Sequence, residues 1–231
     1  MKKVAILQSN YIPWKGYFDL ISYVDEFIVY DDMQFTKNDW RNRNKIKTPQ
    51  GVSWLTIPVG SDNNRKIRDV IFANNDWRLK HCKTLEVNYK KSKFFEEVFS
   101  FIKPIIMDEN LSSLTELNVC LIKSICDYLG ILTPVTYCWD YGLIEGKTER
   151  LVDLCIKSNA DIYVSGLAAK NYINETLFYE NGIQLNWFDY PNYSEYPQLW
   201  GDFEHAVSVL DLIFNCGKDS YKFMRYVNGT I

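Results

Sequence analysis

The sequence lacks any apolar run long enough to cross a membrane. Its beginning, MKKVAILQSN, has two lysines but an uninterrupted hydrophobic run of only four residues, which is far shorter than a signal-peptide core. A large net charge is also absent, because 26 lysines and arginines are nearly balanced by 29 aspartates and glutamates. This balance removes any general attraction to nucleic acid or to an anionic membrane. We therefore expect a soluble, cytoplasmic protein in which any anion site is local.

Several catalytic and metal-binding patterns are missing as well. The six cysteines form no Cys-x-x-Cys pair, and no histidine stands at zinc-ligand spacing, so we expect reduced, mostly buried thiols and no metal site. The chain contains no Gly-x-Ser-x-Gly, His-Glu-x-x-His or Gly-x-Gly-x-x-Gly motif, which disfavours the hydrolases and dinucleotide enzymes that use them. Aromatic residues, in contrast, make up 16% of the chain, and such side chains line ligand pockets as well as cores.

Predicted strands alternate with predicted helices along the chain. Residues 3–8 form a continuous apolar run, which is typical of a strand buried on both faces of a parallel sheet. The pattern predicts further strands at 26–32, 51–60, 131–139, 160–166 and 183–190, helices at 16–24, 76–89, 93–107, 112–129, 147–159 and 171–182, and a loop at 36–50. This order predicts an α/β fold with a mainly parallel, Rossmann-like sheet. We expect one domain over residues 1–231, with residues 75–129 inserted as a helical layer.

Helix ends are also marked in the sequence. Ser112 or Ser113 can cap the helix at 112–129, Glu116 fits a capping box, and Gly130 is expected to end the helix. Pro104 predicts a kink or a boundary in the preceding helix.

Open α/β sheets bind ligands at the carboxyl ends of their strands, so the loops after residues 8, 32, 57, 139 and 164 are candidate sites. In the first loop, Gln8–Gly16, Tyr11 and Trp14 could stack on a ligand and Lys15 could meet a phosphate or carboxylate. Backbone donors of the following helix would add to this anion site. Alternatively, the aromatic side chains plug the end of the sheet and Lys15 is solvated.

The second loop begins with Asp31 and Asp32, which could hold ribose hydroxyls or Mg²⁺. Neighbouring side chains at a strand end point to opposite faces, so at most one of the two is expected to act. Other candidates for substrate binding follow in the same loop: Lys37, Trp40, Arg41, Arg43 and Lys45. Basic residues at alternate positions from Arg41 onward would suit a diphosphate or carboxylate, although an exposed charged hairpin explains them equally well.

The third loop contains Ser165, Gly166 and Lys170, ahead of a helix expected to begin near Asn171. A turn of small residues before a helix can cradle an anion, but strand–helix packing also explains the glycine. Of the two histidines, His81 is the candidate general base, with a structural or surface imidazole as the alternative.

Taken together, the segments LQSNYIPWKGYFDLI, YDDMQFTKNDWRNRNKIKTPQG, YVSGLAAKNYI and LDLIFNCG resemble the WbqC-like family of bacterial proteins. The similarity extends over nearly the whole chain, and Ser9 stands where the family pattern often has proline. The resemblance implies a place in O-antigen and other cell-surface polysaccharide gene clusters, beside enzymes that make amino sugars. The first β-α-β unit also resembles the nucleotidyltransferase and pantothenate-synthetase type of fold. There a His-x-Gly-His signature grips ATP, whereas Trp14-Lys15-Gly16-Tyr17 keeps only the glycine.

The resemblance favours an N-acyl or aminoacyl transferase that acts on a nucleotide-linked amino sugar. In this hypothesis His81 removes a proton from the amine, and Asn10, Lys15 or backbone N–H groups stabilise the oxyanion. Arg41, Arg43 and Lys45 would bind the diphosphate of the sugar nucleotide. Two alternatives stay open: an ATP-using nucleotidyltransferase or amide ligase, and a non-catalytic sugar-nucleotide binding or assembly protein. The sequence identifies neither the sugar, the acyl donor, a cofactor nor the oligomeric state.

Overall fold

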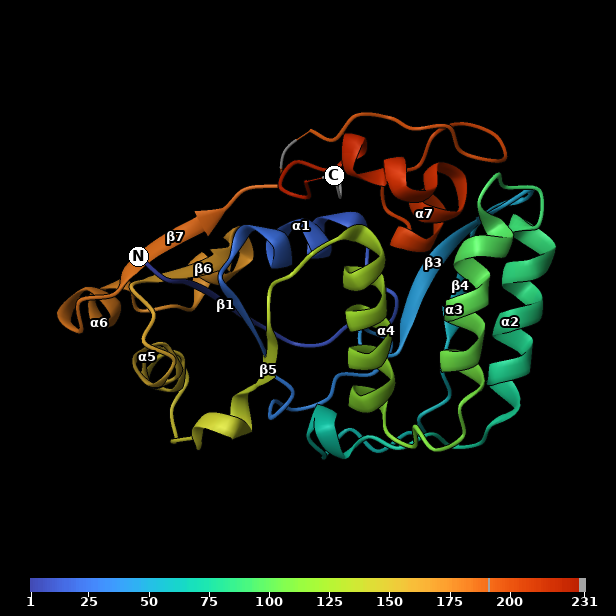
Figure 1. The fold of residues 1–231 in the computed structure, drawn as a ribbon. Helices are drawn as coiled ribbons and strands as arrows, with labels where there is room; N and C mark the ends of the chain where they lie inside the picture. Colours follow the sequence, from blue (N-terminus) through green and yellow to red (C-terminus); the bar gives the residue numbers. More distant parts are fainter. Residues whose placement is uncertain (191, 229–231) are drawn as a thin grey trace.

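Five parallel strands form the main sheet of the computed structural model, which describes residues 1–190 and 192–228 (Figure 1). The strands are β1 (Lys3–Leu7), β2 (Glu26–Val29), β5 (Val135–Tyr137), β6 (Ile162–Gly166) and β7 (Gln184–Phe188). Their order across the sheet is β5-β2-β1-β6-β7, and all four pairings are parallel. This confirms the predicted α/β class and its Rossmann-like, mainly parallel sheet.

The central strand β1 is buried on both faces, as its apolar run predicts. Val4 and Ile6 pack into a hydrophobic cluster on the side of α5 (Thr148–Lys157) and α6 (Glu175–Glu180). Ala5 points to the opposite side, into the main core that also contains α1 (Lys15–Tyr23), α4 (Leu114–Leu129) and α7 (Val209–Cys216). Helices therefore cover both faces of the sheet, as a parallel sheet requires.

Helices α2 (Asp76–Tyr89), α3 (Phe95–Met107) and α4 lie side by side, away from the sheet edge formed by β7 (Figure 1). The capping box of α4 is as predicted, because the Ser113 side chain accepts from Glu116 N and the Glu116 side chain accepts from Ser113 N. Gly130 ends the helix at φ +74°, in the left-handed region. Pro104 lies inside α3 and does not form its boundary.

A separate antiparallel hairpin, β3 (Arg43–Thr48) and β4 (Gly51–Thr56), corrects two predictions. Residues 43–48 were expected to be a loop because of their basic composition, yet they alternate as a strand with Asn44 and Ile46 buried. Residues 51–56 form a strand as predicted but do not join the parallel sheet. The loop after residue 57 is therefore not at the sheet's carboxyl edge.

Short 3₁₀-helices follow two strands of the sheet: Leu167–Asn171 after β6, and Cys138–Tyr141 after β5, where residues 138 and 139 were expected to continue the strand. The helix expected from near Asn171 begins only at Glu175. Further 3₁₀-helices span Ile67–Asp69 and Gly217–Phe223. Because Gly166 leads into a 3₁₀-helix, the anion cradle predicted at the start of an α-helix near Asn171 is not formed.

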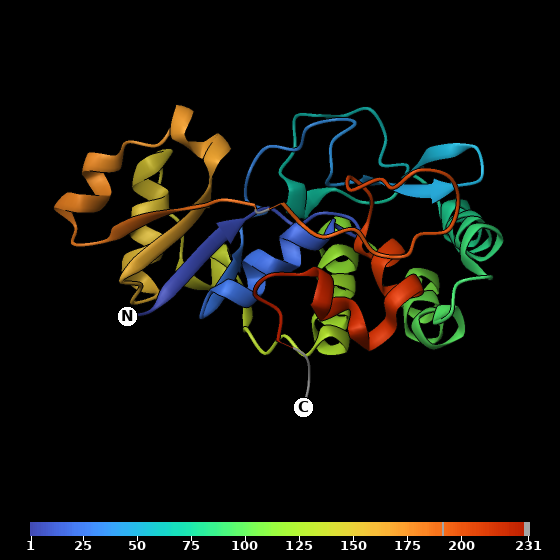
Figure 2. The ribbon, with the colours of Figure 1, turned by 90° about the horizontal axis from the view of Figure 1, so that it is seen from above.

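Residues 192–208, which we call the carboxyl-terminal segment, cross above α1 and approach the β3–β4 hairpin before the chain enters α7 (Figure 2). Two backbone hydrogen bonds fix it: Ser208 N donates to Lys45 O (2.8 Å), and Val209 N donates to Pro13 O (2.9 Å). The segment therefore covers the loop that follows β1.

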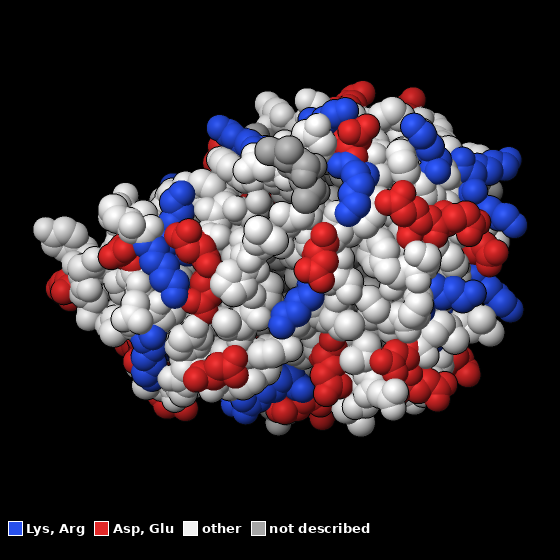
Figure 3. Space-filling view, viewed as in Figure 1, with Lys and Arg blue, Asp and Glu red and all other residues white. Residues whose placement is uncertain are grey.

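Acidic and basic side chains are interspersed on the face shown in Figure 3, in keeping with the balanced composition. All six cysteines are free, and five of them are buried. Within residues 1–190 and 192–228, no helix has the length and apolar character needed to cross a membrane.

Candidate functional site

The candidate site lies where the chain changes direction across the sheet. From β1 the chain proceeds to β2 and β5 on one side, and β6 and β7 later fill the other side. The carboxyl ends of β1 and β6 therefore face the crevice in which open α/β sheets bind ligands. The loop after β1, residues 8–14, forms one wall of this crevice.

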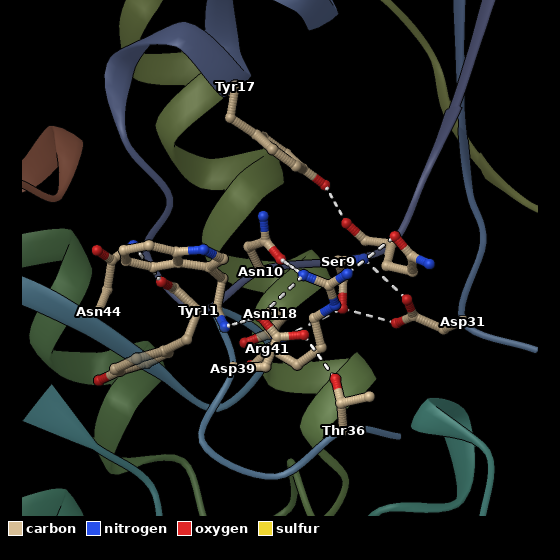
Figure 4. Close-up of polar contacts among 12 residues, drawn as sticks. Ser9, Asn10, Tyr11, Tyr17, Asp31, Thr36, Asp39, Arg41, Asn44 and Asn118 are labelled. Atoms are coloured by element: carbon tan, nitrogen blue, oxygen red, sulfur yellow. Dashed lines mark hydrogen bonds and ion pairs between the residues drawn. The ribbon is translucent and has the colours of Figure 1, made fainter. Parts of the chain in front are cut away.

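A buried carboxylate anchors that loop. Asp31 accepts hydrogen bonds from Ser9 N (2.8 Å), Ser9 Oγ (2.6 Å) and Thr115 Oγ1 (2.7 Å), as Figure 4 shows for Ser9. Burial raises the pKa of Asp31, and the hydrogen bonds from Ser9 and Thr115 oppose that rise. Because these donors occupy its oxygen atoms, Asp31 supports the loop and does not reach a ribose or Mg²⁺.

Helix α4 joins the loop to the segment before β3. Asn118 Nδ2 donates to Ser9 Oγ (3.2 Å) and to Arg41 O (2.9 Å), and Tyr11 N donates to Trp40 O (3.0 Å). Two segments that are 30 residues apart in sequence are therefore fixed side by side.

Arg41 occupies the centre of this arrangement (Figure 4). Its Nη1 donates to Asn10 Oδ1 (3.1 Å), and its Nη2 donates to Gln8 Oε1 (3.0 Å). The only carboxylate within 4 Å of the guanidinium among the described residues is Asp39, whose Oδ1 is 3.6 Å from Nη1. The guanidinium is thus held by neutral amides, and no carboxylate of the described residues forms a close ion pair that would neutralise its charge.

Two cavities are lined by residues that Arg41 binds. The crossover cavity, of about 320 Å³, is lined by the ends of β1 and β6 and by α5, and its polar lining includes Gln8, Tyr30, Lys147, Ser165 and Tyr172. The tryptophan cavity, also about 320 Å³, is lined by Asn10, Pro13, Trp14, Trp40, Asn44, His205 and Ala206. Gln8 lines the first cavity and Asn10 the second, and Arg41 is hydrogen-bonded to both of these residues without lining either cavity.

The loop between the cavities is strained at one residue. Ile12 is buried and has φ +37°, a conformation that a β-branched residue rarely adopts. Asn44 Nδ2 holds it there by donating to Tyr11 O (3.0 Å) and Ile12 O (2.9 Å). Strain of this kind persists only where the surroundings impose it, and it is common at ligand sites.

The structure explains Trp14 and Gly16, but it places Lys15 away from both cavities. A Cβ atom on Gly16 would lie 2.4–2.7 Å from the Trp14 ring, so the glycine makes room for the indole. Lys15 Nζ contacts Ser194 O (3.3 Å) and faces the rings of Tyr193 and Tyr196. Burial lowers the pKa of Lys15 to about 8. The predicted role of Lys15 in binding an anion or oxyanion is not supported by this position.

His81 and Tyr11 pack together inside the helical layer. The Tyr11 hydroxyl lies 2.9 Å from His81 Nδ1, and both side chains are buried. Burial lowers the pKa of His81 to about 4, while a hydrogen bond with the Thr56 backbone opposes the change. Neither residue lines the crossover or tryptophan cavity. The predicted general base His81 and the predicted stacking residue Tyr11 therefore lie outside these two cavities, and His81 lines a separate cavity of about 520 Å³ between β4 and α2.

The basic residues after Asp32 do not share one target. Arg41 turns toward Gln8, whereas the guanidinium of Arg43 stacks on Trp54 with its carbon 4.1 Å from the ring centroid. Lys45 Nζ lies 5.3 Å from the same centroid. Lys37 is exposed on a turn. The predicted diphosphate site of Arg41, Arg43 and Lys45 is therefore split, and only Arg41 binds residues that line the two cavities.

Of the remaining predicted site residues, some line a cavity and others point away from both cavities. Ser165 and Gly166 line the crossover cavity, but Lys170 lies over the Trp187 ring at 5.3 Å and is exposed. Asp32 turns away from Asp31, as the alternation predicts, and its Oδ1 lies 2.9 Å from Lys66 Nζ.

Comparison with known proteins identifies the family. The model of the WbqC-like protein family matches residues 8–223. The chain belongs to the WbqC-like family. This WbqC-like chain is also 52% identical over 228 residues to the uncharacterized protein Rv1507c of Mycobacterium tuberculosis, covering 98% of this chain and 99% of that protein. No solved structure matches it.

Several residues of the WbqC-like site were not predicted from sequence. Asn44 was obscured by the basic residues around it, although its place in an alternating strand is a usable signal. His205 and Tyr172 join the cavities from segments distant in sequence, and no local pattern marks them. Among the described residues, no group of three or more His, Cys, Asp and Glu side chains is arranged to hold a metal ion.

Proposed function

We propose that this protein is an enzyme of bacterial cell-surface polysaccharide (O-antigen) biosynthesis that transfers an acyl or aminoacyl group to a nucleotide-linked amino sugar. The observation that carries the proposal is Arg41, whose guanidinium is held by the side-chain amides of Gln8 and Asn10, one from the lining of each cavity. A guanidinium joined to the linings of two cavities suits a ligand that has a diphosphate between a sugar and a nucleoside. Membership in the WbqC-like family supports the assignment to polysaccharide biosynthesis.

The transfer requires few groups from the protein. The amine nitrogen of the sugar attacks the carbonyl carbon of the activated acyl donor, a base takes the amine proton, and the leaving group departs with its electron pair. Asn10 Nδ2 is available to donate to the developing oxyanion, because only the oxygen of this amide is engaged by Arg41. The base is assigned to His205, which lines the tryptophan cavity, in preference to the buried His81.

The aromatic lining has a defined place in this proposal. Trp14 is braced by Tyr190, with ring centroids 5.1 Å apart, whereas Trp40 is partly exposed beside Trp54. A nucleobase or an acyl chain would stack on these indoles in the tryptophan cavity. The sugar would then extend past Arg41 into the crossover cavity, where Gln8 and Ser165 offer hydrogen-bond partners.

The ATP-using alternative has less support. Its fold analogy requires phosphates to lie over the glycine at the start of α1, but the Trp14 indole already occupies the space above Gly16. Lys15 is directed to the carboxyl-terminal segment and is not available to phosphates there.

The first test is isothermal titration calorimetry with UDP-, dTDP- and GDP-linked amino sugars, and with ATP, CTP, acetyl-CoA and a folate cofactor in parallel. Arg41→Lys should weaken binding of the sugar nucleotide by roughly 10-fold or more, because lysine cannot reproduce the guanidinium fork. Arg43→Lys is the matched control, since Arg43 stacks on Trp54 and not on the loop. Its affinity should stay within about 2-fold of the wild-type value.

The outcomes separate the hypotheses. Formation of an acylated sugar nucleotide, detected by mass spectrometry with the donors above, would establish the transfer. Binding of ATP or CTP alone would favour the nucleotidyltransferase or ligase. Binding of a sugar nucleotide without turnover would favour a non-catalytic binding protein. The proposal fails when no sugar nucleotide binds, or when Arg41→Lys and Arg43→Lys bind equally well.

A further inference from the structure

Three basic side chains from two distant segments converge on one buried carboxylate. The Asp32 side chain is only 3% exposed. Its Oδ1 lies 2.9 Å from Lys66 Nζ and 3.0 Å from Arg68 Nη1, and its Oδ2 lies 3.3 Å from Arg150 Nη1. We refer to Lys66, Arg68 and Arg150, with Asp32 between them, as the Asp32 cluster.

The Asp32 cluster has more positive than negative charge at its centre. One carboxylate cannot neutralise three cations, and Asp31 is turned to Ser9 and Thr115. Two further acids stand at the rim: Asp69 Oδ1 is 3.9 Å from Arg68 Nε, and Glu145 Oε2 is 3.8 Å from Arg150 Nη2. Both rim carboxylates are well exposed, so solvent screens them and leaves the centre positive.

Two of the three cations are partly exposed to solvent, whereas the charged groups of a purely structural buried ion pair are not. The side chains of Lys66 and Arg68 are 46% and 36% exposed, so they present N–H groups to solvent while Asp32 holds their other side. Arg150 is more buried, and its Nε donates to Ile144 O at 2.7 Å. Asp32 therefore fixes the orientation of three donors whose free N–H groups can meet an incoming anion.

The cluster adjoins the crossover cavity through the sequence neighbours of Asp32 and of Arg150. Tyr30 and Met33, which flank the aspartate pair, line this cavity, as do Lys147 and Thr148 beside Arg150. The positive charge of Arg150 acts on the Tyr30 hydroxyl, because it opposes the rise in pKa that burial causes there. A ligand in the cavity can therefore extend toward the cluster.

We propose that the Asp32 cluster is a second phosphate-binding subsite, in addition to the diphosphate position proposed at Arg41, and that it takes a phosphate group of a ligand whose remainder lies in the crossover cavity. The two guanidinium groups can each form paired N–H···O bonds with phosphate oxygens, and the lysine adds a point charge. The ligand class is a phosphorylated sugar or nucleotide. This identification rests on the proposed function only for the sugar-nucleotide part, since phosphate recognition depends on the cluster alone.

The test uses inorganic pyrophosphate as the probe, titrated calorimetrically into the full-length protein at constant ionic strength. Lys66→Gln and Arg68→Gln should each weaken pyrophosphate binding by roughly 10-fold, because each removes a charge-assisted hydrogen bond. The matched control is Lys222→Gln, an exposed lysine that pairs with Asp219 at 2.8 Å and is remote in sequence from the cluster. Lys66→Gln and Arg68→Gln each leave two cations beside Asp32, and Lys222→Gln leaves the cluster unchanged. Thermal unfolding of each variant shows whether it is folded.

The proposal is overturned when wild-type protein does not bind pyrophosphate, or when Lys66→Gln and Lys222→Gln weaken binding equally. Sulfate binding as tight as that of pyrophosphate would also overturn it, because this would indicate general attraction of anions. A second titration separates the two proposals. Pyrophosphate binding that is equal in wild type and Lys66→Gln, together with a sugar nucleotide that binds through Arg41, would refute the subsite and leave the proposed function intact. Pyrophosphate binding that depends on the cluster, in a protein that binds no sugar nucleotide, would support the subsite and refute the proposed function.

Discussion

At the scale of single residues, Arg41 is a charged side chain that is positioned without being neutralised. Its bonds to Gln8 and Asn10 fix the plane of the guanidinium, and Asp39 interacts at the longer distance of 3.6 Å. An anionic ligand would meet donors that are already oriented, so little side-chain entropy would be lost on binding. A fully salt-bridged arginine would first have to break its ion pair.

His81 differs from Arg41 because its protonation affects stability. Its pKa is lowered to about 4 from 6.5, so between these pH values the unfolded chain binds a proton that the folded protein does not. The free energy of unfolding should therefore fall as the pH decreases through this window, by roughly 3 kcal/mol in total. In His81→Gln this contribution is absent.

Urea unfolding at pH 7 and pH 4.5 measures the effect. The wild-type protein should lose about 2–3 kcal/mol more than His81→Gln over this interval, because the other titrating groups are common to both proteins. Equal losses in the two proteins would show that His81 is not held neutral by burial.

At the scale of elements, the start of α1 depends on the fit between Gly16 and Trp14. Gly16→Ala would place a methyl group within 3 Å of the indole, which Tyr190 and Tyr193 hold from the other side. We expect a loss of roughly 1–3 kcal/mol in the free energy of unfolding. Thermal and denaturant unfolding of the purified variant would measure it.

The control is Gly166→Ala, where an added Cβ has no neighbour within 4 Å and φ is −68°. Its stability should change by less than about 1 kcal/mol. In a Trp14→Leu background, Gly16→Ala should also cost little, because the ring is gone. A full loss in that background would place the cause outside the Gly16–Trp14 contact.

Sequence motifs within a segment correctly predicted α4 and β1. The capping box at Ser113 and the left-handed Gly130 marked α4, and the apolar run of β1 marked a strand buried on both faces. The β3 strand was missed because its buried face includes Asn44, whose side chain satisfies backbone carbonyls of another loop. A polar residue that is buried for the sake of a distant partner has no signal in its own segment.

At the scale of the whole molecule, one buried network joins the hairpin, the helical layer and the carboxyl-terminal helix. Lys47 N donates to Tyr89 Oη (2.9 Å), and Tyr89 Oη donates to Asp211 Oδ2 (2.8 Å). Tyr196 Oη donates to Asp211 Oδ1 (2.9 Å). The three parts are therefore linked through two tyrosine hydroxyls and one carboxylate.

Tyr89→Phe should lower the free energy of unfolding by roughly 1–3 kcal/mol, because it leaves Lys47 N without its partner and removes a donor from Asp211. Tyr179→Phe is the matched control, since Tyr179 is 84% exposed and its variant should stay within about 0.5 kcal/mol of wild type. Chemical denaturation compares them. Equal stability of the two variants would mean that the network contributes nothing measurable.

The candidate site is built from segments that are distant in sequence, and the sequence therefore predicted it only in part. Gln8, Asn10, Trp14, Trp40, Arg41, Ser165 and Gly166 were predicted and do line or join the two cavities. Lys15, Arg43 and Lys45 follow the same local patterns but point elsewhere, because side-chain direction depends on which segment packs against each one. The cations of the Asp32 cluster come from segments that sequence analysis did not connect.

The position of β1 has a consequence for how the chain folds. Val4 pairs with Glu26 on one side and with Tyr163 on the other. At a synthesis rate of roughly 5–20 residues per second, the second partner follows the first strand by roughly 8–30 s. During that interval one edge of an apolar strand has no native neighbour, and long-range parallel pairing is slow to form. Newly made chains should therefore be most prone to aggregation, and most dependent on chaperones, until residue 166 has emerged from the ribosome.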